Sequence, residues 1–245
     1  SVRKDMHYQV HFGANYESGA YGWTTDKETI RRSIDAQLTA LKTDYIDYGF
    51  IHCLDEEKDW QAYQEEGALG FLMELKKQGV ARHIGLSSHT PGLVQQILDT
   101  GFVDQVMFSV NPGYDYSHGD YANGSTEERM SLYRRCEADG VGISVMKPFS
   151  GGQLLDDKTS PFGRALTQYQ CIQYALDKPG VVTVLPGIRN MEDVKELLRF
   201  FDVSPKERDY SILGTFTPGE AVGNCVYCNH CQPCPAGLNV GLINP

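Results

Sequence analysis

Strand-like and helix-like segments alternate along most of this chain, and that alternation limits the folds open to it. Short runs rich in β-branched and aromatic residues predict strands at 6–12, 45–53, 82–87, 105–110, 141–147 and 181–185. Amphipathic segments between them predict helices at about 25–41, 57–78, 90–100, 125–140, 161–177 and 190–201. Six β/α pairs of this kind indicate an α/β protein with a parallel sheet and helices outside it.

An open doubly wound sheet and a closed β/α barrel both fit that pattern. The open sheet would need a glycine-rich phosphate turn after its first strand, and Phe12-Gly13-Ala14-Asn15 does not supply one. A barrel gathers its chemistry at the C-terminal ends of the strands. Polar and glycine residues occupy those ends: His52, Ser87-Ser88-His89, Asn111, Lys147 and Gly187. We therefore predict a barrel over residues 1–208, followed by a linker and a small cysteine-rich segment over 209–245.

Four cysteines at intervals of three lie near the C-terminal end: Cys225, Cys228, Cys231 and Cys234, with Pro235 after the last. Thiolates at this pitch can hold one compact inorganic core, and a Cys-Pro ending is typical of bacterial ferredoxin-type runs. Zinc ribbons instead separate two Cys-x-x-Cys pairs by roughly 15–20 residues. The run therefore predicts an iron–sulfur cluster, of the 4Fe-4S type, more strongly than a structural zinc site. Cys234 could also serve a second cluster, whose other ligands would lie beyond Pro245.

Composition limits which classes of binding partner and which cellular location are expected. A net charge of −10 with no cluster of Lys and Arg argues against a nucleic-acid partner. No apolar run approaches the roughly 18 residues of a membrane span, and Ser1–Asp5 does not begin a signal peptide. Seven cysteines, four of them in one short run, argue against a disulfide framework and favour the cytoplasm. Cys53, Cys136 and Cys171 are expected to act as small apolar residues inside strands or helices.

Four motifs in register suggest a family. They are Thr43-Asp44-Tyr45-Ile46-Asp47-Tyr48 leading to His52, His83-Ile84-Gly85-Leu86-Ser87, Met146-Lys147-Pro148-Phe149 with Gly151-Gly152, and Leu185-Pro186-Gly187-Ile188-Arg189-Asn190. Residues 3–203 thereby resemble the aldo/keto reductase family, and the tail at 225–237 resembles its subgroup with a C-terminal ferredoxin-type segment. The resemblance implies a (β/α)8 TIM-type barrel that transfers hydride between a nicotinamide cofactor and a carbonyl or alcohol.

The family's catalytic positions are Asp, Tyr, Lys and His, and the resemblance places two of them in this chain. His52 matches the His, which would hydrogen-bond the carbonyl oxygen and orient the substrate. His11 stands where the family has Lys, whose charge lowers the pKa of the Tyr phenol. Near half charged at neutral pH, His11 is expected to do this partly or to act as acid or base itself. The Asp and Tyr have no counterpart, so the sequence is expected to lack two β/α units; a six-stranded domain that closes against a partner is the alternative.

The resemblance also assigns cofactor-binding residues. Ser87, Ser88 and Asn111 match positions that hold the nicotinamide amide, although strand-end capping would use the same residue types. Lys147, Pro148, Gly151 and Gly152 are expected along the pyrophosphate, where glycine allows close approach to the backbone. The turn into the last helix contributes Gly187, Ile188, Arg189, Asn190 and Glu192. Arg189 could pair with a 2′-phosphate there, which favours NADP(H) over NAD(H), or could simply flank a capped helix.

The sequence therefore predicts a cytoplasmic nicotinamide-dependent oxidoreductase that acts on a small carbonyl or alcohol. Its iron–sulfur cluster would exchange electrons with a partner. Two alternatives remain: an electron-transfer or binding module on a barrel that has lost aldo/keto chemistry through His11, and a zinc-stabilised barrel.

Overall fold

The computed structural model of the chain describes residues 2–16, 18–215, 231, 234–238 and 240. Six strands follow the hydrogen-bonded order β1-β4-β5-β6-β7-β8. They are β1 (Gln9–Phe12), β4 (Ile46–Ile51), β5 (Ala81–Ser88), β6 (Gln105–Ser109), β7 (Gly142–Met146) and β8 (Val181–Val184). The β1–β4, β4–β5 and β7–β8 pairs are parallel. The predicted alternation of six strands with helices is thus confirmed.

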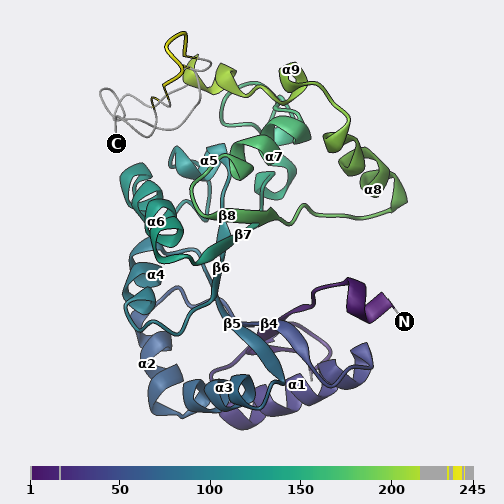
Figure 1. Cartoon of the computed structure of the whole chain (residues 1–245), viewed down its shortest axis with the longest axis vertical. Helices are drawn as coiled ribbons and strands as arrows, with labels where there is room; N and C mark the ends of the chain where they lie inside the picture. Colours follow the sequence, from purple (N-terminus) through teal and green to yellow (C-terminus); the bar gives the residue numbers. More distant parts are fainter. Residues whose placement is uncertain (1, 17, 216–230, 232–233, 239, 241–245) are drawn as a thin grey trace. The chain divides into compact units, whose positions relative to one another are not determined.

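Two compact units divide the chain, Ser1–Met107 and Phe108–Pro245. The first contains α1 (Lys27–Leu41), α2 (Glu57–Glu65), α3 (Ala68–Lys77) and α4 (Pro91–Leu98). Its helices α1 and α3 pack against strands β1 and β5 (Figure 1). The second unit contains α5 (Pro112–Asp115), α6 (Thr126–Asp139), α7 (Gln168–Leu176), α8 (Met191–Leu198) and α9 (Pro205–Arg208). None of the described helices is long and apolar enough to cross a membrane.

Glycines within two strands of the first unit make room for aromatic rings. A Cβ atom at Gly49 would lie 2.1 Å from ring carbons of Phe12, and one at Gly85 would lie 2.5 Å from ring carbons of Phe50. Both phenylalanines are fully buried. Since real Cβ atoms do not approach so closely, these positions require glycine, and they let the neighbouring strands pack tightly beside the site described below.

Helix boundaries differ from the predicted ones where local signals were misread. The predicted helix at 57–78 is two helices, because Gly67 lies between them in the left-handed region with φ 77°. The helix expected from residue 161 begins only at Gln168, where Thr167 and Gln170 form a capping box. Asp26 caps α1 through a bond from the Thr29 N–H. Ser125 and Glu128 form a capping box at the start of α6, where the predicted helix begins.

A buried ion pair lies in the second unit. Arg129 Nε donates to Asp115 Oδ1 at 2.8 Å, and both side chains are fully buried. The hydroxyl groups of Tyr133 and Tyr174 donate to the two oxygens of the same carboxylate, each at 2.7 Å. Arg129 also donates to the backbone oxygens of Ser109 and Asn123. The network connects the end of β6, α5, α6 and α7, and the buried charges are fully hydrogen-bonded.

Candidate active site

Three histidines lie at the C-terminal ends of neighbouring parallel strands in the first unit. His11 lies in β1, His52 follows β4 and His89 follows β5. The His52 N–H donates to the Phe12 carbonyl at 3.0 Å, so the pairing of β1 with β4 continues to the strand ends. The Leu54 N–H likewise donates to the Ser87 carbonyl at 3.0 Å. Since parallel strands end at one edge of the sheet, their last side chains meet there.

A chain of hydrogen bonds joins His11, His52 and Tyr21. His52 Nδ1 lies 2.9 Å from His11 Nδ1, and His52 Nε2 lies 2.8 Å from the Tyr21 hydroxyl. Each contact needs one proton, and neutral imidazoles satisfy both: Tyr21 can donate to His52 Nε2 while His52 Nδ1–H donates to His11, or both bonds can run in reverse. Through these hydrogen bonds the Tyr21 phenol can therefore release a proton or take one up.

Tyr21 reaches His52 because a small hairpin follows β1. Strands β2 (Ala14–Asn15) and β3 (Gly22–Trp23) are antiparallel, and the indole N–H of Trp23 donates to the His52 carbonyl at 2.7 Å. Gly13 begins the hairpin with φ 102°, and a Cβ there would lie 2.8 Å from the Thr24 carbonyl oxygen. Glycine is therefore required at this turn. Tyr21 is largely exposed, so the residue is accessible to a small molecule.

Burial keeps His11 and His52, the two histidines of this hydrogen-bonded chain, neutral. It lowers the pKa of His11 to about 4, with a further contribution from His52. Burial and then His89 lower the pKa of His52, while Asp55 opposes the change. The pKa of Tyr21 is raised by burial and then by Cys53 and Tyr16. The expectation that His11 is near half charged at neutral pH is therefore wrong, because its desolvated ring holds no proton charge at pH 7.

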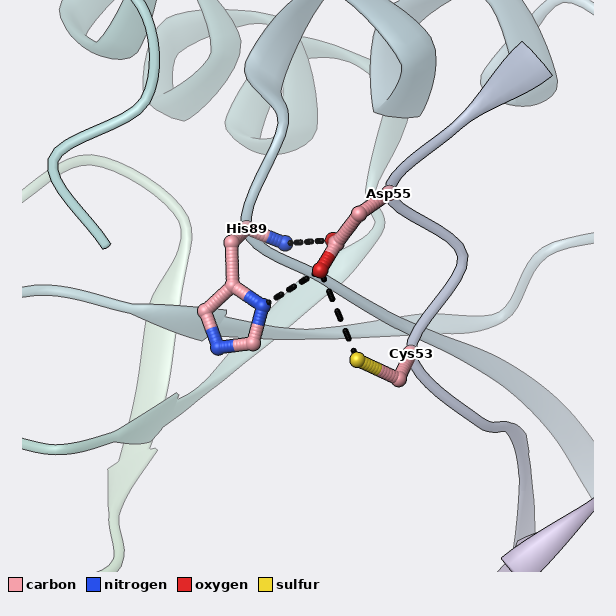
Figure 2. A group of neighbouring side chains, drawn as sticks. All are labelled: Cys53, Asp55 and His89. Atoms are coloured by element: carbon pink, nitrogen blue, oxygen red, sulfur yellow. Dashed lines mark hydrogen bonds and ion pairs between the residues drawn. The ribbon is translucent and has the colours of Figure 1, made fainter. Parts of the chain in front are cut away.

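Cys53, Asp55 and His89 form a second cluster (Figure 2), and Cys53 directly follows His52 in the sequence. Asp55 Oδ2 accepts from His89 Nδ1 at 2.9 Å and from the Cys53 thiol at 3.4 Å. Asp55 Oδ1 accepts from the His89 N–H at 2.6 Å and from the Ser88 hydroxyl at 3.1 Å. Burial alone would raise the pKa of Asp55, but the bonds from the side chain and backbone of His89 lower it to about 2.

The two serines expected at the nicotinamide amide are both buried at the end of β5. The Ser88 hydroxyl donates to Asp55 and accepts from the Thr90 N–H at 3.1 Å, so it is used within the Asp55 cluster. The carbonyl of Ser87 accepts from Leu54. Their role toward a cofactor stays a prediction.

In the second unit, Asn111 caps a short helix. Its Oδ1 accepts from the Tyr114 N–H at 2.9 Å, and its Nδ2 donates to the Lys147 carbonyl at 2.9 Å. Its amide thus ties the end of β6 to the end of β7. The ammonium of Lys147 lies 3.0 Å from the centroid of the Tyr121 ring. The stretch between β6 and α6 is partly helical, and Tyr114 and Tyr116 within it are buried.

Glycines after β7 and β8 leave open space beside the backbone. Pro148 is buried, while Gly151 and Gly152 are exposed, with φ 67° and 97°, and a Cβ at either would meet no atom within 4 Å. Gly187 is equally open. Exposed glycines of this kind allow the close approach of a ligand, and the role of this stretch toward a pyrophosphate stays a prediction.

The turn before α8 is held by Asp193. Asn190 Oδ1 accepts from the Asp193 N–H at 2.9 Å, which caps the helix as expected. Arg189 donates from Nε and from its terminal nitrogen to the Asp193 carboxylate, at 3.0 and 3.2 Å, and its side chain is 85% exposed. Glu192 pairs with Lys195, and Ile188 is exposed. The guanidinium of Arg189 is thus oriented by Asp193 and open to solvent.

Of the four tail cysteines, Cys225 and Cys228 lie outside the described residues. Cys231 is exposed, and Cys234 is half-buried. Backbone N–H groups of Leu238 and Ala236 hydrogen-bond the Cys234 sulfur and lower the pKa of its thiol. These bonds favour the thiolate, the form that ligates metals.

The other cysteines divide into two kinds. Cys136 and Cys171 are buried, and burial raises the pKa of each thiol to about 12, so they act as apolar residues as expected. Cys53 does not: it follows β4, is half-buried and contacts Asp55. Sequence reasoning also missed Tyr21, Trp23 and Asp55 as site residues. A Cys-x-Asp directly after the matched His52 was a usable signal for Asp55, whereas Tyr21 had none.

Known proteins similar to this chain are oxidoreductases. The family model described as "Aldo/keto reductase family" matches residues 16–168. The uncharacterized oxidoreductase YqkF of Bacillus subtilis is 24% identical over 79% of this chain and 68% of its own length. L-galactose dehydrogenase of Arabidopsis thaliana is 26% identical over 71% of this chain and 58% of its own length.

A solved structure agrees with the fold. The holo form of aldo-keto reductase AKR11C1 from Bacillus halodurans is similar at a TM-score of 0.65 and 23% identity, over 84% of this chain and 72% of that one. The α/β fold here is therefore that of the aldo-keto reductase (β/α)8 barrel, with six of its strands in the described sheet. Because the family model matches more than half of the chain, the protein belongs to the aldo/keto reductase family of NAD(P)H-dependent oxidoreductases.

Proposed function

We propose that this protein interconverts a small carbonyl compound and its alcohol, and that Tyr21, His52 and His11 move the proton. The observation that carries the proposal is the hydrogen-bonded chain from the Tyr21 hydroxyl through both nitrogens of His52 to His11. A phenol beside a neutral imidazole is a suitable general acid for a carbonyl oxygen, and the exposed residue leaves room for a substrate.

A nicotinamide cofactor, when bound, would supply the hydride for the carbonyl carbon or accept it from the alcohol carbon. Tyr21 donates its hydroxyl proton to the carbonyl oxygen, and His52 Nε2–H stabilises the resulting phenolate or returns a proton to it. When His52 Nε2–H gives its proton to the phenolate, His52 Nδ1 takes the proton of His11 Nδ1. One proton from solvent then replaces the one that His11 gave, so both histidines end neutral. Tyr21 thereby acts as the general acid. His11 acts as an uncharged proton relay at the position where the family has a Lys.

The second unit, taken by itself, has residues suited to binding the phosphates of a nicotinamide cofactor. Gly151, Gly152 and Gly187 leave the backbone open, which supports binding of a pyrophosphate. Arg189 is exposed and held in position by Asp193, which supports pairing with a 2′-phosphate and hence NADP(H) rather than NAD(H).

Arg189→Ala should change the affinity for NADPH and the affinity for NADH by different amounts. Titration of the wild type with NADPH should give a saturable change in tryptophan fluorescence, because Trp23 is bonded to the His52 carbonyl. The variant should bind NADPH about 10–100-fold more weakly, the loss of a charge-assisted pair worth roughly 1.5–3 kcal/mol, and NADH almost unchanged. Loss of NADPH absorbance with small aldehydes and ketones then measures turnover.

Arg199→Ala is the matched control for Arg189, since Arg199 also forms an exposed ion pair, with Glu196, at the other end of α8. It should bind both cofactors like the wild type. Equal weakening of NADPH and NADH in Arg189→Ala would remove the 2′-phosphate assignment. Absence of any saturable change with either cofactor would instead favour a barrel that has lost aldo/keto chemistry.

The tail extends the proposal to electron transfer. Cys225, Cys228, Cys231 and Cys234 form a donor set typical of a 4Fe-4S cluster, as in the ferredoxin-like subgroup of the family. Backbone bonds to the Cys234 sulfur support this, because such bonds also tune cluster potentials. The cluster would pass electrons between the nicotinamide and a cytoplasmic partner protein.

Protein purified without oxygen should contain roughly four iron and four sulfide per chain. Cys231→Ser should lower both, because it removes one of four thiolate ligands. Cys136→Ala, which changes a buried thiol in α6, should keep the full iron and sulfide content. Stoichiometric zinc without sulfide in the wild type would support the zinc-stabilised alternative and reject the cluster.

A further inference from the structure

In the cluster of Cys53, Asp55 and His89, a thiol and an imidazole are directed at the same carboxylate oxygen, and the three residues come from two neighbouring strand ends (Figure 2). We propose that these three side chains bind a divalent transition-metal ion, with Zn²⁺ as the best match. Thiolate, carboxylate and imidazole are the three ligand types that zinc takes in proteins. None of its three residues belongs to the cysteine run of the tail, and the proposal does not rest on the proposed function.

The two donor distances to Asp55 Oδ2 are close to those of a zinc site. The thiol sulfur and His89 Nδ1 lie 3.4 and 2.9 Å from Asp55 Oδ2, and one donor atom from each residue lies within 4.8 Å of the others. Tetrahedral zinc with ordinary bond lengths holds S, N and O ligands roughly 3.4–3.6 Å apart. The sulfur–oxygen pair already has this spacing, and the nitrogen–oxygen pair needs to open by only about 0.5 Å, through side-chain rotation.

Two protons now hold the cluster together, and a cation can replace both. The Cys53 S–H and the His89 Nδ1–H each donate to the same carboxylate oxygen. Loss of the Cys53 proton and a shift of the His89 proton from Nδ1 to Nε2 leave a thiolate, a carboxylate and a neutral imidazole, whose combined charge of −2 balances a divalent ion. Metal ligands that are pre-assembled in this way release protons when the ion binds.

The surrounding residues orient the carboxylate as metal sites require. The Ser88 hydroxyl and the His89 N–H donate to Asp55 Oδ1, and the Thr90 hydroxyl donates to the Asp55 carbonyl at 3.1 Å. Asp55 Oδ2 is thereby turned toward the other two ligands, and outer bonds of this kind raise metal affinity. His89 is buried, whereas Cys53 and Asp55 are half-buried, which leaves an entry path. Three protein ligands leave one tetrahedral position for water or another ligand.

The backbone of Cys53 has a strained conformation, which is common at functional sites. Its φ of 53° lies in the left-handed region, which a non-glycine side chain seldom adopts. This conformation places the thiol over the carboxylate two residues later. A purely structural tie between the strand ends would need only Asp55 with His89 and Ser88, and would gain little from a strained cysteine.

Co²⁺ titration tests the site, because thiolate ligation gives Co²⁺ a charge-transfer absorption. The full-length chain with all four tail cysteines changed to serine should bind one Co²⁺ with this band, and Zn²⁺ should displace it. Cys53→Ser should abolish the band, while Asp55→Asn and His89→Gln should weaken binding at least 10–100-fold. His83→Gln, which changes an exposed histidine on the same strand β5, should bind like the parent.

A second readout guards against a variant that fails to fold. Cys53→Ser keeps a donor for Asp55, so its circular dichroism should match the parent, and Zn²⁺ at 100 times the dissociation constant should raise the melting temperature of the parent only. No stoichiometric Co²⁺ binding in the tail-serine chain would overturn the proposal. A thiolate band that persists in Cys53→Ser would do the same, since the ligand would then be another cysteine.

Discussion

Tyr21→Phe should lower kcat for carbonyl reduction about 10²–10⁴-fold, the usual contribution of a positioned general acid. The variant keeps the ring, which contacts the His52 imidazole edge-on with centroids 5.9 Å apart, and loses only the hydroxyl that lies 2.8 Å from His52 Nε2. KM for the cofactor should change little, since no cofactor contact is removed. Steady-state rates with NADPH and a small aldehyde measure both quantities.

Tyr16→Phe is the matched control, because Tyr16 lies on the same hairpin loop, is exposed, and contacts the Tyr21 ring. Its kcat should stay within about twofold of the wild type. His52→Gln should resemble Tyr21→Phe. In the oxidation direction the wild-type rate should fall only below pH 6.5, because both histidines have lowered pKa values and remain neutral acceptors above it. A Tyr21→Phe enzyme with wild-type kcat would show that another group protonates the carbonyl oxygen.

Local signals predicted much of the fold. Six strands and most helices follow from periodicity and capping residues, and the capping box at Ser125 is an example, because its bonds join residues three apart. The failures also have local causes. Gly67 is a single residue within an otherwise helical pattern, yet its left-handed conformation ends α2. Strands of two residues, as in the hairpin that carries Tyr21, are too short to show a period.

The site depended on contacts that no local pattern encodes. His52 was identified through a motif, but its partners His11 and Tyr21 lie 41 and 31 residues away in sequence. Asp55 and His89 are 34 residues apart and meet only because β4 and β5 are neighbours. The charge state of His11 could not be predicted either, because its low pKa arises from burial between strands. Residue types at strand ends were predictable, whereas their hydrogen bonds were not.

Arg129→Met should lower the free energy of unfolding by about 3–5 kcal/mol, the usual cost of removing one partner of a buried ion pair. The Asp115 carboxylate would stay fully buried and keep only the Tyr133 and Tyr174 hydroxyls as side-chain donors. The backbone carbonyls of Ser109 and Asn123 would lose the donor that Arg129 provides. Because a domain is stable by only about 5–15 kcal/mol, chemical denaturation should show a much lower midpoint.

Arg135→Met, on the same helix α6, is the control. It distinguishes the loss of stability from breaking the buried ion pair from that of removing an arginine in general. Arg135 pairs with Asp139 at the surface, where such an i,i+4 pair contributes about 0.3–0.5 kcal/mol. Asp115→Asn combined with Arg129→Met should recover part of the loss, because the buried charge is then removed while the amide can still bond the two hydroxyls. Equal midpoints for Arg129→Met and Arg135→Met would mean that water reaches Asp115 and that the network is not a buried ion pair in solution.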